Sequence, residues 1–160
     1  MALVRELTPS DSDWHEYVAM IEAEGQSQWA FAPHFEPFSR HYVMAKQDGR
    51  VVGFLMYVVW EIGPHDRDHP PVVLNGQKLT EAKILAFGVR EAYRRRGIGR
   101  ALQEHTLRRA RALGCHQVRS VSDADHPQNQ RLKLAMGFAV EPMERDQPTL
   151  AFIMPLTRPS

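Results

Sequence analysis

The residues best suited to chemistry form a basic turn with the sequence RRRGIGR at residues 94–100. A hydrophobic run at residues 84–89 precedes it, and an amphipathic run at residues 98–113 follows it. This order predicts a strand, a turn and a helix N-terminus, where unpaired backbone N–H groups and the helix dipole favour an anion. Gly97 and Gly99 let the backbone approach a ligand closely, and the arginines supply positive charge. The pattern therefore predicts a phosphate-binding turn.

Two common glycine loops do not fit this turn. A Walker A loop ends in Gly-Lys-Ser/Thr, and Gly-Lys occurs nowhere in the chain. A dinucleotide-binding fingerprint needs a third small residue, where this chain has Leu102. A solvated basic turn that only caps a helix is a further alternative, but adjacent arginines repel one another unless an anion is near.

The turn resembles the [Gln/Arg]-x-x-Gly-x-[Gly/Ala] motif of the GNAT family of N-acetyltransferases, with Arg94, Gly97 and Gly99 at the defined positions. A second segment, residues 126–138, resembles the helix near the end of that motif region, which ends in Gly-Phe. Pro127 suits the first helical position and Gly137 suits the residue after the helix. The similarity covers about residues 80–140.

Apolar periodicity elsewhere predicts a chain of alternating strands and helices. Asp48-Gly49 between two apolar runs is typical of a β-hairpin. Thr8 or Ser10 is the expected cap of the first helix. The expected strands are residues 3–7, 41–46, 50–60, 79–89, 117–122, 138–141 and 149–155, and the expected helices are residues 11–23, 98–113 and 127–136. Residues 26–40 are expected to form a loop with a short helix, and residues 63–77 a polar connection.

This order and the resemblance together imply an α/β (mixed α+β) fold, the GNAT acyl-CoA N-acyltransferase fold. Its sheet is mixed and mostly antiparallel, with helices on both faces. We expect residues 1–160 to form a single N-acetyltransferase domain.

The composition limits the classes of function. The chain is 43% apolar and 24% charged, as expected of a soluble globular protein, and its net charge of +1 argues against a nucleic-acid partner. No run is long and apolar enough for a membrane span, and no secretory leader is evident. Cys115 is the only cysteine, which excludes an intramolecular disulfide and agrees with a cytoplasmic location. We expect this side chain to pack in the core.

The resemblance implies that acetyl-CoA, the acetyl donor, binds with its pyrophosphate on the turn. Its pantetheine arm would pair with exposed backbone of the preceding strand. His126 lies where the family commonly has an asparagine that orders this arm, and Asn129 is the alternative; His126 would otherwise cap a helix. The implied cofactor-binding residues are Phe87, Val89, Arg94, Arg95, Arg96, Gly97, Ile98, Gly99, Arg100, His126 and Asn129.

Acetyl transfer to an amine requires a base for the amine and an acid for the departing thiolate. Lys133 lies where the family often has a tyrosine that acts as the acid, and it either takes this role or has none. Tyr93, Tyr57 and a bound water are the other candidates. Glu81 and Glu61 are the candidate bases, and the alternative for each is a solvated strand end.

Trp29 and Phe31 lie where the family builds one wall of the acceptor site, although core packing is the default for aromatic residues. In that wall they would favour an acceptor with an apolar part. Residues 65–69, His-Asp-Arg-Asp-His, are expected to line the acceptor entrance rather than hold a metal.

The expected function is acetyl-CoA-dependent transfer of an acetyl group to a primary amine by direct attack in a ternary complex. A catalytically weak or inactive CoA-binding module of the same fold is the alternative. The identity of the amine acceptor does not follow from the sequence. Homodimers are frequent in the family, and the oligomeric state stays open.

Overall fold

The computed structural model describes residues 1–31, 36–67, 69–123, 127–143 and 148–156. The chain divides into two compact units. The first unit comprises Met1–Val58 and Ile84–Thr106, and the second comprises Val59–Lys83 and Leu107–Ser160. The boundary falls inside three elements, namely strand β3 (Arg50–Glu61), strand β6 (Thr80–Val89) and helix α4 (Ile98–Ala112).

The first unit is built on the β2–β3 hairpin, in which Asp48 and Gly49 form the predicted turn. Both residues have positive φ, 53° and 72°, as the turn type that matches strand twist requires. This unit also contains β1 (Leu3–Leu7), α1 (Trp14–Ala23), α2 (Ser27–Ala30), β2 (Ser39–Gln47) and the short 3-10 helix η1 (Glu91–Tyr93). Strands β1 and β2 pair antiparallel, with Leu3 opposite Lys46 and Leu7 opposite Tyr42.

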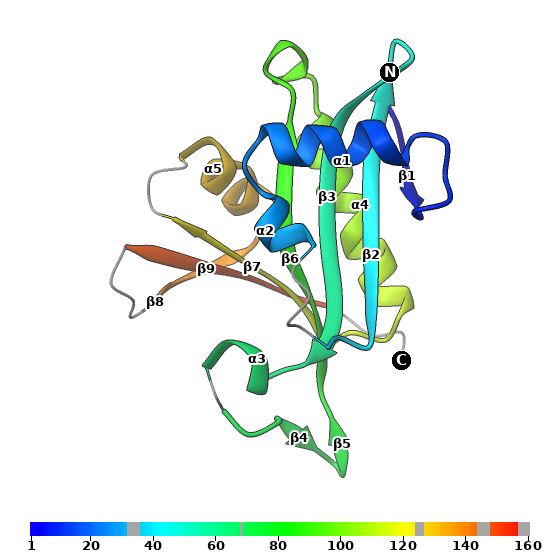
Figure 1. The fold of residues 1–160 in the computed structure, drawn as a ribbon. Coiled ribbons are helices and arrows are strands. Elements are labelled where there is room, and N and C mark those ends of the chain that lie inside the picture. The colour runs from blue at the N-terminus through cyan, green and yellow to red at the C-terminus, as the bar shows by residue number, and fades with distance from the viewer. Residues whose placement is uncertain (32–35, 68, 124–126, 144–147, 157–160) are drawn as a thin grey trace. The chain divides into compact units, whose positions relative to one another are not determined.

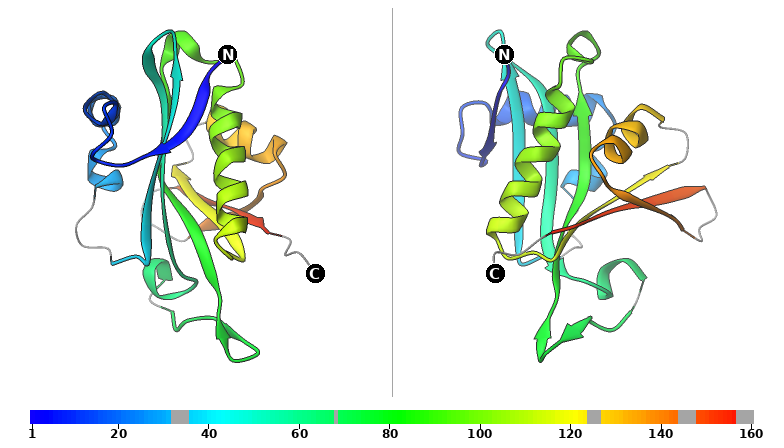
Figure 2. Two further views of the ribbon diagram at one scale, coloured as in Figure 1. Left: turned by 90° about the vertical axis from the view of Figure 1, so that its right-hand side faces the viewer. Right: turned by 180° about the vertical axis from the view of Figure 1, so that it is seen from behind.

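Helices α1 and α4 lie on opposite faces of this hairpin (Figures 1 and 2). On the α1 face, the Tyr17 hydroxyl donates to the Leu55 carbonyl at 3.1 Å. On the α4 face, Leu102 and Ile98 pack so closely on Gly53 that an added Cβ would lie 3.1 and 3.2 Å from them. Glycine at position 53 therefore lets α4 approach the strand.

The first helix begins later than the sequence predicts. We expected residues 11–23 with a cap from Thr8 or Ser10, but α1 begins at Trp14 and no side chain caps it. The Asp11 carboxylate instead accepts from the Asp13 N–H at 3.0 Å and from Arg5 at 2.6 Å. These bonds hold the preceding residues in a turn, so the predicted start and cap were wrong.

The second unit is dominated by antiparallel strands. It contains α3 (Pro64–Arg67), β4 (Val73–Leu74), β5 (Gln77–Lys78), β7 (Gln117–Asp123), α5 (Pro127–Ala135), β8 (Ala139–Met143) and β9 (Thr149–Pro155). Strand β9 pairs antiparallel with both β7 and β8. In the described part of the chain the large sheet has seven strands, in the order β1-β2-β3-β6-β7-β9-β8. The predicted mixed α/β fold, with a mostly antiparallel sheet flanked by helices, is confirmed.

The described residues of the segment expected to be a polar connection contain regular structure. They form α3 and β4, and β4 pairs antiparallel with β5. Asn75 and Gly76, with φ of 52° and 76°, form the turn of this second hairpin. The Asn-Gly pair is itself a hairpin signal, so the sequence contained the information. No helix in the described part of the chain is both long and apolar enough to cross a membrane.

Candidate functional site

The predicted phosphate-binding turn has the backbone of an anion-binding site. Arg95 and Gly97 are left-handed, with φ of 64° and 80°. Left-handed backbone in a turn can direct neighbouring N–H groups toward one side, which creates a concave anion site. Among the described residues, no atom lies within 4 Å of a Cβ added at Gly97. The first hydrogen bond of α4 runs from Ala101 N–H to the Gly97 carbonyl at 3.0 Å, so the three preceding N–H groups lack helical acceptors.

Side chains around the turn hold it in this shape. The Arg94 Nε donates to the Val89 carbonyl at 3.0 Å and so ties the turn to the end of β6. The Tyr93 hydroxyl donates to Asp48 in the β2–β3 turn at 3.2 Å. The Arg96 guanidinium lies 5.1 Å from the Tyr93 ring centroid. Arg94 and Tyr93 therefore stabilise the turn, while the remaining arginines are exposed to a ligand.

The backbone of Phe87, a predicted contact of the pantetheine arm, is already hydrogen bonded. The Gln26 side chain accepts from the Phe87 N–H at 2.9 Å and donates to the Phe87 carbonyl at 3.0 Å. This amide pairs with β6 as a neighbouring strand would. Sequence reasoning missed Gln26, because nothing local to residue 26 indicates a partner at residue 87.

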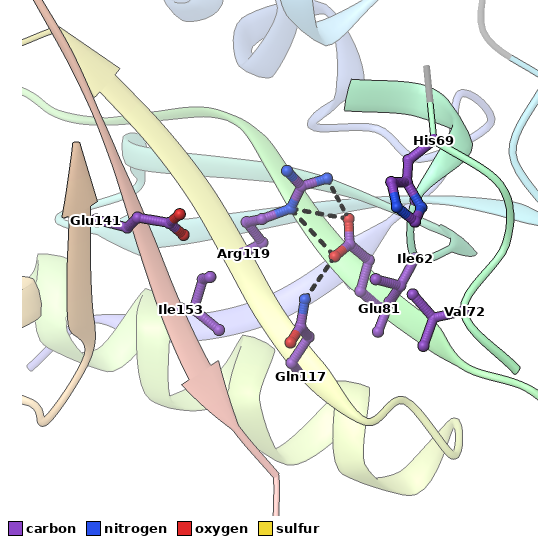
Figure 3. A pocket seen from close by; sticks show the side chains of 9 residues that line it. Ile62, His69, Val72, Glu81, Gln117, Arg119, Glu141 and Ile153 are labelled. Carbon is purple, nitrogen blue, oxygen red and sulfur yellow. Dashed lines mark hydrogen bonds and ion pairs between the residues drawn. The ribbon is translucent and has the colours of Figure 1, made fainter. Parts of the chain in front are cut away.

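In the second unit, Glu81 is a fully buried member of an ion pair. It is 0% exposed, and the Arg119 guanidinium donates to it at 2.6 Å. Gln117 Nε2 also donates to it at 2.8 Å (Figure 3). Trp60 Nε1 is a further donor, at 2.9 Å. Arg119 Nε donates to both oxygens, at 3.1 and 3.0 Å, so each carboxylate oxygen accepts at least two hydrogen bonds. This burial contradicts a solvated strand end, and the occupied lone pairs weigh against Glu81 as the base.

Glu61, the other candidate base, ends β3 and is partly exposed. Its carboxylate pairs with the exposed Lys78 ammonium at 3.3 Å. Such pairs at the surface contribute little stability because water and salt screen them. Glu61 and Glu81 therefore differ sharply in environment.

A pocket of about 250 Å³ lies over the Glu81–Arg119 pair (Figure 3). Its walls come from the segment after β3, from the starts of β6 and β7, and from β8 and β9. The residues that line it are Ile62, Gly63, His69, Val72, Glu81, Gln117, Arg119, Glu141 and Ile153. Within the predicted entrance segment, residues 65–69, the pocket is thus lined by His69.

Lys133 is buried rather than directed to solvent. Its side chain is 2% exposed, and its Nζ donates to the Ser120 hydroxyl at 2.6 Å. The same ammonium lies 5.1 Å from the Phe152 ring centroid. Burial lowers the pKa of Lys133 to about 8. An amine with this pKa exists in both protonation states near neutral pH, as an acid–base group requires.

Asn129 precedes Lys133 by four residues, so both side chains share one face of α5. The Asn129 Oδ1 is buried and has no hydrogen-bond partner among the described residues. An unsatisfied buried carbonyl is costly, and a ligand N–H would satisfy it. Asn129 therefore fits the predicted contact with an amide of the pantetheine arm. His126, the alternative, lies outside the described residues.

The two predicted acceptor-wall residues differ. Phe31 packs in an aromatic cluster, with its ring 6.0 Å from Trp14 and 5.9 Å from Tyr42, whereas Trp29 is 52% exposed. Cys115 is buried, as predicted. The structure brings Phe87, Val89 and the turn together in the first unit. It places Glu81, Glu61, Asn129 and Lys133 in the second.

Comparison with known proteins agrees with this architecture. A family model described as the acetyltransferase (GNAT) family matches residues 3–138. Arabidopsis thaliana NAA60 in complex with acetyl-CoA superposes with a TM-score of 0.74 at 18% identity, covering 98% of this chain and all of that one. The ribosomal-protein-S18-alanine N-acetyltransferase from Escherichia coli superposes with a TM-score of 0.66 at 18% identity, and the match covers 100% of this chain and 97% of that one. The GNAT domain of S. lividans PAT superposes with a TM-score of 0.69 at 21% identity, and the match covers 97% of this chain and 90% of that one.

A search of curated proteins gave no significant match. The structural likenesses support the fold, and the family model covers most of the chain. The chain therefore belongs to the GNAT acetyltransferase family, whose members transfer acyl groups. The NAA60 structure contains acetyl-CoA.

Proposed function

We propose that this protein is an N-acetyltransferase that transfers the acetyl group of acetyl-CoA to a primary amine by direct attack in a ternary complex. The observation that carries this proposal is the turn at residues 94–100. Its left-handed Arg95 and Gly97, its unpaired N–H groups and its position before α4 suit a pyrophosphate. Gly97 leaves the space that a phosphate oxygen needs.

The second unit supplies groups for the remaining steps. The Asn129 Oδ1 would accept a hydrogen bond from an amide N–H of the pantetheine arm. The acceptor nitrogen attacks the thioester carbonyl, and the C–S bond breaks with its electron pair on sulfur. The Lys133 ammonium, with a pKa of about 8, is well matched to protonate a thiolate whose conjugate acid has a pKa of ~8.5. Lys133 would thus replace the tyrosine of related enzymes.

Calorimetric titration with acetyl-CoA tests the turn. Gly97→Glu adds a side chain and a negative charge where the pyrophosphate would bind, so binding should be lost. Gly114→Glu is a matched control, because Gly114 has nearly the same φ, 81°, and an added Cβ there also meets no described atom within 4 Å. Equal loss in the two variants, or no binding by the wild type, would contradict the proposal.

A screen of primary amines with acetyl-CoA tests turnover. Release of free CoA that depends on one of the amines is the expected result. Binding of acetyl-CoA without turnover would favour the alternative, a CoA-binding module. The departure at Lys133 from the common tyrosine motivates that alternative.

A further inference from the structure

Close backbone contacts hold the described residues of the loop that lines the pocket over Glu81. The Val72 N–H donates to the Ile62 carbonyl at 3.1 Å, and the Leu79 N–H donates to the Val72 carbonyl at 2.8 Å. Gly63 has a φ of 121°, and an added Cβ would lie 2.5 Å from the Pro70 carbonyl oxygen. The backbone at Pro70 is therefore held close to Gly63, and this fixes the backbone position of the neighbouring residue, His69.

The chemistry of the lining favours a cation with an apolar part. Ile62, Val72 and Ile153 supply apolar surface. Glu81 and Glu141 supply carboxylates, and Arg119 supplies a guanidinium. A concave site with apolar walls and carboxylate groups suits small organic cations. A primary alkylammonium ion has both properties.

His69 is the lining group best able to take a proton. Its Nδ1 lies 2.8 Å from the Pro70 carbonyl oxygen, which can only accept, so Nδ1 carries the hydrogen. The neutral ring then has its lone pair on Nε2. The ring extends from its loop toward Glu81 and Ile62 (Figure 3), and its exposure lets a bound proton leave to water.

The other titratable groups of the lining are less suitable. The Glu81 carboxylate is occupied by its hydrogen bonds, and arginine does not lose its proton in proteins. Glu141 is an exposed carboxylate, and a carboxylate is in general a far weaker base than an imidazole. His69 remains.

We propose that this pocket binds the ammonium end of a primary alkylamine acceptor and that His69 Nε2 is the general base. The inference rests on the proposed N-acetyltransferase function. Nε2 takes one proton from the ammonium group, and the freed nitrogen pair forms the C–N bond as the C–S bond breaks. The Lys133 ammonium protonates the thiolate and is restored by the second nitrogen proton, and His69 releases the first proton to water. The products are the N-alkylacetamide, CoA and one proton. Glu81 is a positioning residue for Arg119.

Two variants and one control test this role. His69→Ala removes the base, and His69→Gln retains a donor for the Pro70 carbonyl but cannot act as a base. The control is His15→Ala, since His15 is an exposed residue of α1. Acetyl-CoA turnover is measured with n-butylamine, phenethylamine and spermidine between pH 6 and 10. Nitrogen-15 NMR of the wild type, with the His69 signal assigned by its absence in His69→Ala, gives the ring tautomer.

We expect both His69 variants to lose about 10²–10⁴-fold in kcat at pH 7, with unchanged acetyl-CoA affinity. The deficit should shrink toward pH 10, where the free amine needs no base. Neutral His69 should carry its proton on Nδ1. Activity of His69→Ala within threefold of wild type, or a proton on Nε2, would overturn the assignment of His69 alone. Absence of acetyl-CoA binding by the wild type would instead overturn the function on which it rests.

Discussion

The buried Lys133 should make the stability of this protein depend on pH above neutrality. Folding lowers the pKa of this side chain from its ordinary value of 10.5 to about 8. At a pH between these two pKa values, Lys133 carries a proton in the unfolded chain that it lacks in the folded chain. The free energy of unfolding therefore rises with pH in this window.

The size of the effect follows from the two pKa values. Each tenfold change in proton affinity is worth about 1.4 kcal/mol, so the charged Lys133 destabilises the fold by about 3 kcal/mol at pH 7. The cost falls to about 1 kcal/mol at pH 10 as the folded group loses its proton. Because Lys133 is 2% exposed, solvent screens little of this cost.

Urea unfolding of wild type and Lys133→Met at pH 7, 8, 9 and 10 measures this contribution. Methionine has a similar shape and no charge. The difference in unfolding free energy, wild type minus variant, should rise by about 2–3 kcal/mol from pH 7 to pH 10. Lys78→Met, at an exposed lysine, should leave the pH dependence unchanged. Parallel pH curves for wild type and Lys133→Met would refute the reasoning.

Two further perturbations separate other features of the site. Gln26→Ala removes both hydrogen bonds to Phe87, for which the pantetheine arm would compete. At about 1 kcal/mol for each bond, acetyl-CoA affinity should therefore rise by up to roughly thirtyfold. A weaker affinity in calorimetry would show that Gln26 assists the ligand instead. Glu81→Gln removes the buried carboxylate charge that pairs with Arg119 at 2.6 Å and should cost about 3–5 kcal/mol in urea unfolding. Glu61→Gln should cost less than about 1 kcal/mol, and equal costs would contradict the contrast between the two carboxylates.

Features encoded by neighbouring residues could be predicted from the sequence. The Asp48-Gly49 turn depends on the φ angles that these two residues tolerate. The phosphate-binding turn depends on glycines and arginines within a few positions. The Asn75-Gly76 hairpin is equally local, since it depends on two adjacent residues that tolerate positive φ.

Features that join distant residues could not be predicted in this way. Glu81 is buried because Arg119, 38 residues later, neutralises its charge. Gln26 pairs with a strand residue 61 positions away. Periodicity describes which face of an element is apolar, and it says nothing about the polar partner that a buried group acquires. The functional assignments that depend on such partners therefore needed the structure.

The environment of Trp60 gives the pocket its own optical signal. The indole donates to the Glu81 carboxylate, and its ring stacks on His65 with 4.3 Å between centroids. Indole emission is sensitive to nearby charge, so a cation entering the pocket should shift the fluorescence of Trp60. Trp14 and Trp29 belong to helices of the first unit, and phenylalanine at both positions would leave Trp60 as the sole indole emitter. Acceptor candidates could then be ranked by titration without coupling to turnover.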